Sequence, residues 1–194
     1  MIDLDRCLFV IRHYAGVLVA LNWTAEQGAM IARHGERGYP NEICGFLLGT
    51  RTDGTATVRE VVPVENHWEA LDERRRRFMI APEDFLREER RAREAGWEIL
   101  GFYHSHPDHP ARPSETDREA AWPGYSYVIQ SVRDSSAAEV TSWLLKDDRS
   151  GYDQEDIVDC GMRSADSASP NAAVAGQGSA STSANPQYKG EEHG

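Results

Sequence analysis

The chain has 194 residues, enough for one domain with a hydrophobic core but a tight fit for two. Its 32 Asp and Glu outnumber its 21 Lys and Arg, and the formal net charge of -11 argues against nucleic acid or an anionic membrane surface as the main partner. Its three cysteines are odd in number and lack Cys-x-x-Cys spacing, which excludes a disulfide framework and a thiolate zinc knuckle and predicts a cytoplasmic protein.

The two ends of the chain differ in composition from its middle. We predict that residues 1–16 are an N-terminal extension and that residues 17–160 fold as one domain. Residues 161–194 are mostly Ala, Ser, Gly, Asn and Pro, too poor in large apolar groups to offset the entropy of ordering, so we predict a disordered tail. The uncharged stretch at residues 14–25 is shorter than the ~20 apolar residues of a spanning helix, so we predict no membrane segment.

The middle of the chain carries both helical and strand patterns, which predict a mixed α/β fold. Thr24 and Gln27 have the spacing of a capping box at a helix start. The turn sequence at residues 52–54 joins two apolar runs, as in a β-hairpin. The predicted helices cover residues 25–37, 82–95 and 114–122, and the predicted strands cover residues 17–21, 43–50, 55–64, 97–106, 125–132 and 140–146.

The chemistry-bearing residues begin on the fourth of these strands and continue to the start of the next predicted helix. Side chains alternate along a strand, so His104 and His106 face the same way, with Cα atoms ~6.6 Å apart. Asp117 lies at the start of the next predicted helix, from which a loop could bring it back. Two imidazoles and one carboxylate fit an open catalytic zinc site. Taken separately, the histidines also fit a plain polar strand face, and Ser114 with Asp117 fits a helix cap.

Together these residues resemble a known family. His104-Ser105-His106-Pro107, with seven residues between His106 and Ser114 and then Asp117, is similar to the motif of JAMM, or MPN+, metalloproteases. Upstream, the segment at residues 41–49, Asn-Glu-Ile-Cys-Gly-Phe-Leu-Leu-Gly, resembles the family's glutamate element. The resemblance covers roughly residues 17–148 and departs from the family at no motif position.

The resemblance implies both the fold and the site. The fold would be a central mixed β-sheet flanked by helices. His104, His106 and Asp117 would bind one catalytic Zn²⁺ ion. Glu42 would hold the water and act as general base, and Ser114 would donate a hydrogen bond to the developing oxyanion. Glu42 is identified by the resemblance alone.

The resemblance also implies a substrate class. Small bacterial stand-alone members act on the C-terminal tail of ubiquitin-like or sulfur-carrier proteins, and residues 65–77 leave little room for a larger substrate-gripping insertion. We therefore expect hydrolysis of a peptide or isopeptide bond after Gly-Gly. The alternatives are a deubiquitinase-like isopeptidase on other conjugates and a non-catalytic scaffold. Residues 78–80 are either an edge strand that pairs with such a tail or an ordinary core strand.

Several other residues have less specific interpretations. We expect Cys44 to be a small buried side chain and His109 to be solvated. The four arginines at residues 74–77 are either a solvated face or a groove edge for an acidic partner. An iron oxygenase of the cupin type would need a Glu where Pro110 and Ala111 stand, and a zinc deaminase would need Pro-Cys-x-x-Cys. The carrier, the leaving group and the oligomeric state stay open.

Overall fold

The computed structural model describes residues 20–160 of the chain. The predicted extension at residues 1–16 and the predicted tail at residues 161–194 lie outside the described residues, so both remain predictions. The elements in chain order are β1 (Ala20–Trp23), α1 (Ala25–Gly38), β2 (Cys44–Thr52), β3 (Thr55–Val64), a 3-10 turn (Leu71–Glu73), α2 (Pro82–Glu94), β4 (Glu98–Pro107), α3 (Glu115–Ala120), β5 (Ser126–Arg133), β6 (Ser136–Leu145) and β7 (Tyr152–Asp159).

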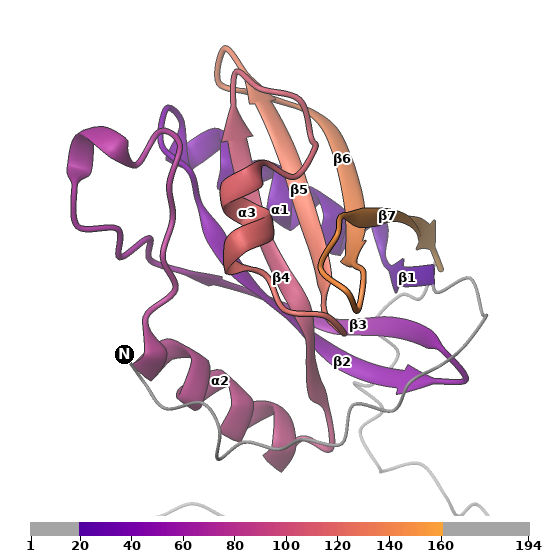
Figure 1. Cartoon of the computed structure of the whole chain (residues 1–194). Helices are drawn as coiled ribbons and strands as arrows, with labels where there is room; N and C mark the ends of the chain where they lie inside the picture. Colours follow the sequence, from indigo (N-terminus) through magenta and orange to yellow (C-terminus); the bar gives the residue numbers. More distant parts are fainter. Residues whose placement is uncertain (1–19, 161–194) are drawn as a thin grey trace, which may run out of the picture. The chain divides into compact units, whose positions relative to one another are not determined.

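The strands form a closed barrel in the order β1-β3-β2-β4-β5-β6-β7. β1 closes it by pairing in parallel with both β3 and β7. β4 and β5 are also parallel, and the remaining neighbours are antiparallel. β4 thus lies between β2 and β5, with α2 near its start and α3 beside its C-terminal half (Figure 1). The predicted mixed α/β class is confirmed.

The centre of the sheet is covered on both faces. One cluster of buried side chains joins Ile31 of α1 to Leu47 of β2 and Leu100 of β4. A second cluster joins Phe46 of β2 to Ala92 of α2. A strand buried on both faces needs apolar side chains without alternation, which explains the unbroken apolar run of β2. This packing fixes the position of β4, the strand that carries both histidines.

Local sequence signals account for most element boundaries. Thr24 accepts a hydrogen bond from the backbone N–H of Gln27, whose side chain accepts one from the backbone N–H of Thr24, so the capping box that begins α1 is confirmed. Asp53 and Gly54 both have positive φ angles, as the tight turn between β2 and β3 requires. Pro82 occupies the first turn of α2, as predicted.

Two features differ from the sequence prediction. β7 was not predicted, because its eight residues include four acidic groups and lack an alternating apolar pattern. It becomes a strand through pairing with β6 and β1. The prediction of a strand at residues 78–80 is wrong, since these residues are irregular. They belong to a linking segment, residues 65–81, which connects β3 to α2 and contains the 3-10 turn.

Candidate metal centre

β4 presents two histidines on one face. Its hydrogen-bonded neighbours hold both positions, because His104 lies opposite Cys44 on β2 and His106 lies opposite Ser131 on β5. The two Nε2 atoms are 3.0 Å apart. His104 is only 2% exposed and His106 8%. The predicted convergence of the two imidazoles is therefore present, in a site that is largely shielded from bulk water.

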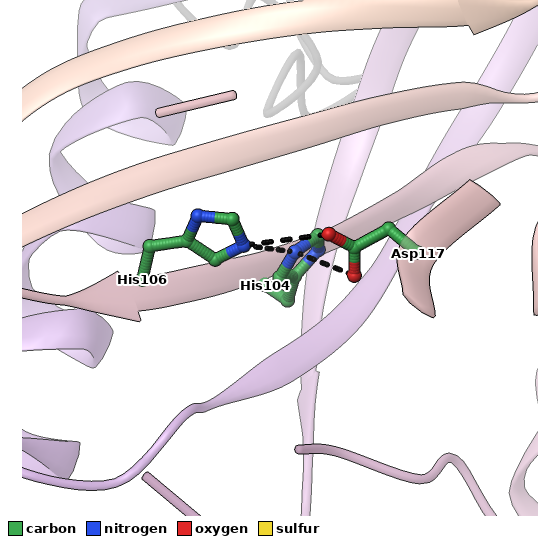
Figure 2. Close-up of side chains that lie close together, drawn as sticks. All are labelled: His104, His106 and Asp117. Carbon is green, nitrogen blue, oxygen red and sulfur yellow. Dashed lines mark hydrogen bonds and ion pairs between the residues drawn. The ribbon is translucent and has the colours of Figure 1, made fainter. Parts of the chain in front are cut away.

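Asp117 approaches these imidazoles from α3. Its Oδ1 atom lies 3.4 Å from Nε2 of His104, and its Oδ2 atom lies 3.6 Å from Nε2 of His106. One possible ligand atom from each of the three residues lies within 4.8 Å of the others. Figure 2 shows the two rings projecting from β4 and the carboxylate meeting them from α3. The structure thus brings together all three predicted metal ligands.

Hydrogen bonding prepares His106 to act as a ligand. Its Nδ1 atom lies 2.9 Å from the backbone carbonyl oxygen of Pro110. A carbonyl oxygen only accepts, so Nδ1 carries a proton, and in the neutral ring it is Nε2 that has the lone pair for an ion. Burial lowers the pKa of His104, which favours the neutral imidazole that binds metals.

The carboxylate of Asp117 is held in its charged form. Burial favours protonation, but the interactions with His104, His106 and Ser114 outweigh it and hold the pKa of Asp117 well below its usual range. Two imidazole nitrogens and one charged oxygen therefore converge as an open three-ligand set. This donor set fits a divalent metal ion with further coordination positions left for water or substrate.

Glu42 lies just before β2 and is 7% exposed. Burial raises the pKa of Glu42 to about 8. The charge of His106 opposes this rise and that of Asp117 adds to it, so Glu42 lies close enough to the metal ligands for their charges to act on it. A carboxyl group with a pKa near neutrality can both take and release a proton at neutral pH. The structure buries Glu42 within range of these charges, and its role as general base remains a prediction.

Ser114 serves as the N-cap of α3. Its hydroxyl accepts a hydrogen bond from the backbone N–H of Asp117 and donates one to Oδ2 of the same residue, at 2.6 Å. Its own backbone N–H also donates to that oxygen, which completes a capping box. The helix-cap interpretation is therefore confirmed. Because the same hydroxyl donates to the carboxylate of a candidate metal ligand, the cap also orients that side chain.

The linking segment supplies site residues that the sequence did not reveal. The ring of Phe78 stacks on His104, and a guanidinium nitrogen of Arg77 donates to the hydroxyl of Thr116 on α3. Arg77 also acts on the pKa of Glu42, in the lowering direction. Neither residue belongs to the motif. The apolar triplet at residues 78–80, directly after the arginine run, was the available signal, but it was interpreted as a strand.

Three other interpretations are now decided in part. Cys44 is fully buried and burial raises the pKa of its thiol to about 12, so it is a packing residue and a poor nucleophile. His109 is exposed, as predicted. Arg75 and Arg76 are exposed and line a surface pocket of about 290 Å³ together with Asp72, Pro107, Asp108 and His109.

Among residues 20–160, no helix is long and apolar enough to cross a membrane.

Comparison with known protein families identifies the family of this chain. The profile of the family described as prokaryotic homologs of the JAB domain matches residues 25–146. The chain belongs to this family. The matched span of the JAB domain contains all five motif residues singled out from the sequence, Glu42, His104, His106, Ser114 and Asp117.

Individual relatives agree with this assignment. A protein of Haloferax volcanii named desampylase is 41% identical over 100 residues, which cover 50% of this chain and 68% of the relative. The solution structure of a Salinibacter ruber protein shares 44% identity, covers 72% of this chain and 90% of its own, and has a TM-score of 0.57. That of a Desulfitobacterium hafniense protein shares 35% identity, covers 71% and 91%, and has a TM-score of 0.61. The two solved structures thus resemble this chain over about 70% of its length, well beyond the motif residues.

Proposed function

We propose that this JAB domain is a zinc metallopeptidase that hydrolyses the bond after the C-terminal Gly-Gly of a ubiquitin-like or sulfur-carrier protein, in the cytoplasm. The observation that carries the proposal is the convergence of two histidines and one aspartate beside a buried glutamate. The relative named desampylase supports the ubiquitin-like substrate class. A carrier tail that ends in two glycines is extended and slender, which suits a shielded site.

The roles of the ligands follow from their geometry. His104, His106 and Asp117 would hold the ion through Nε2, Nε2 and a carboxylate oxygen. Zinc bound there supplies Lewis acidity, which polarises a carbonyl and lowers the pKa of water towards ~7. Pro110 keeps His106 in the tautomer that this role needs.

The proposed chemistry also needs a group that moves a proton. Glu42 would take the proton of the attacking water on its carboxylate and pass it to the leaving nitrogen as the C–N bond breaks. Burial raises the pKa of Glu42, which helps its carboxyl group to hold the proton between the two halves of this transfer. Ser114 would donate a hydrogen bond to the oxygen that gains negative charge. That role requires its hydroxyl to turn from Asp117 towards the substrate.

Intact-mass spectrometry tests the proposal. The zinc-loaded chain is incubated with small Gly-Gly carriers that are extended by a peptide or joined to a lysine side chain. We expect a mass loss that ends at the second glycine, and a ~10²–10⁴-fold slower loss with Glu42→Gln, which retains zinc. Cleavage of the lysine-linked carrier alone would favour the isopeptidase alternative. An inert, folded and zinc-loaded wild type would contradict the proposal and favour a scaffold.

A further inference from the structure

The backbone of Glu42 is held by the linking segment rather than by a neighbouring strand. Glu42 precedes the first residue of β2 by two positions. Its N–H donates to the carbonyl oxygen of Arg74 at 2.7 Å. Its carbonyl oxygen accepts from Nδ2 of Asn66 at 3.0 Å. Both main-chain polar groups of the proposed general base are therefore bonded to one irregular segment.

Asn66 uses its whole amide in this region. Besides the bond to Glu42, its Nδ2 atom donates to the carbonyl oxygen of Arg77 at 2.9 Å. Its Oδ1 atom accepts from the backbone N–H groups of Trp68, at 2.9 Å, and Met79, at 3.2 Å. A primary amide has two donor hydrogens and one acceptor oxygen with two lone pairs, so these four bonds fill its capacity. The side chain is 9% exposed, and water has little access to replace a lost bond.

These bonds connect two parts of the site. On one side, Asn66 binds the main chain of Glu42. On the other, it binds Arg77 and Met79, the residues on either side of Phe78, whose ring stacks on His104. One buried amide thus sets the position of Glu42 relative to the segment that packs on a metal ligand.

We propose that Asn66 is a positioning residue for the general base of this enzyme, an inference that rests on the proposed function. Its amide fixes the carbonyl of Glu42, and the carbonyl of Arg74 fixes the N–H of the same residue. The carboxylate is thereby aimed without help from a regular strand. Proton transfer depends on such aim, because a displacement of ~1 Å in a reacting group can cost ~10²-fold in rate.

The test compares Asn66 variants with a variant of the next residue. Asn66→Asp keeps an acceptor for Trp68 and Met79 but loses both donor hydrogens, and Asn66→Ala loses all four bonds. His67→Ala is the matched control. The side chain of His67 lies 3.4 Å from Asp84 on α2, so its removal loosens the same segment while every bond of Asn66 stays.

We expect both Asn66 variants to lower kcat by about 10–100-fold with little change in KM or bound zinc, and His67→Ala to stay within about threefold of wild type. Unchanged kcat in Asn66→Asp, or a loss of kcat that merely follows a loss of zinc, would overturn the inference. Should Asn66→Ala not fold, Asn66→Asp decides the matter.

A second readout does not need activity. We expect the amide proton of Glu42 to exchange at least about tenfold faster in Asn66→Asp than in wild type, while amides of β5 keep their protection and His67→Ala leaves Glu42 unchanged. Equal protection of Glu42 in all three proteins would overturn the inference. A wild type that cleaves no carrier but shows this exchange pattern would contradict the proposed function and leave the positioning role standing.

Discussion

The ring of Phe78 stacks on the imidazole of His104, with centroids 4.6 Å apart and planes inclined by 24°. The contact covers one face of a buried candidate ligand and limits the rotation of its ring. It also joins the irregular linking segment to the rigid strand β4. A residue outside the motif therefore helps to orient a residue inside it.

This contact predicts a measurable effect on metal binding. We expect Phe78→Ala to weaken zinc binding by about 2–10-fold, because a stacked aromatic pair is worth ~0.5–1.5 kcal/mol. Competition with a chromophoric chelator measures the change. Phe85→Ala, which removes a ring packed on Phe46 away from the site, is the control. Equal weakening in both variants would mean that the effect comes from general loosening.

Buried His104 and exposed His109 give a second prediction. His104→Ala should lose bound zinc and peptidase activity together, because two ligands rarely retain zinc against dilution. His109→Ala should keep both, since that side chain is exposed and lines only the surface pocket. Metal analysis after gel filtration, combined with the carrier assay, checks both. Full zinc occupancy in His104→Ala would show that the ligand assignment is wrong.

Ser114 has a structural role as a helix cap and a proposed catalytic role. A comparison with Thr24, the cap of α1, distinguishes the two. Ser114→Ala should lose about 1 kcal/mol of stability as a lost N-cap and about 10²–10³-fold in kcat as a lost oxyanion donor. Thr24→Ala removes the corresponding cap of α1 and should cost similar stability at full activity. Urea unfolding and steady-state kinetics measure the two effects. A full-rate Ser114→Ala would leave the serine as a cap alone.

Glu155 predicts a pH dependence of stability. It is 3% exposed on β7 and bonded to the hydroxyls of Ser126 and Ser142. Burial raises the pKa of Glu155, although both serine hydrogen bonds oppose the rise. The folded chain therefore holds this proton to a higher pH than the unfolded chain. Stability from this group is present at acidic pH and decreases as the pH rises from the ordinary glutamate range through the raised pKa.

Glu155→Gln removes this titration. Relative to wild type, its free energy of unfolding should increase as the pH rises from about 4 to 8. Urea unfolding at several pH values measures the difference. Glu139→Gln, which removes an exposed carboxylate on β6, should show no such trend. A difference for Glu155→Gln that is flat with pH would contradict the prediction.

Local sequence rules predicted most of the fold because the deciding interactions are local. The cap at Thr24, the turn at Asp53-Gly54 and Pro82 at a helix start each act within a few residues. β7 was not predicted because it pairs with β1, which is far away in the sequence. Closure of the barrel was not predicted for the same reason, since it depends on the pairing of β1 with β7.

In the candidate site, too, local patterns predicted some residues, while others depend on tertiary contacts. Strand alternation predicted the shared face of His104 and His106, and the cap pattern placed Asp117 at a helix start. Glu42 needed the family resemblance, since its burial depends on the linking segment folding over it. The sequence drew attention to residues 78–80 but not to the stacking of Phe78 on His104, and it gave no signal for Asn66, because both roles depend on tertiary contacts.

The pairing of β1 with β7 sets an order on folding during synthesis. Synthesis proceeds from the N-terminus, so β1 leaves the ribosome long before β7, one of its two strand partners, has been synthesised. α1, the β2–β3 hairpin, α2 and β4 can assemble around their own contacts, and the site histidines lie in this early part. The barrel closes only after residues 156–159 have been synthesised. Until then the sheet of the nascent chain has two unpaired edges.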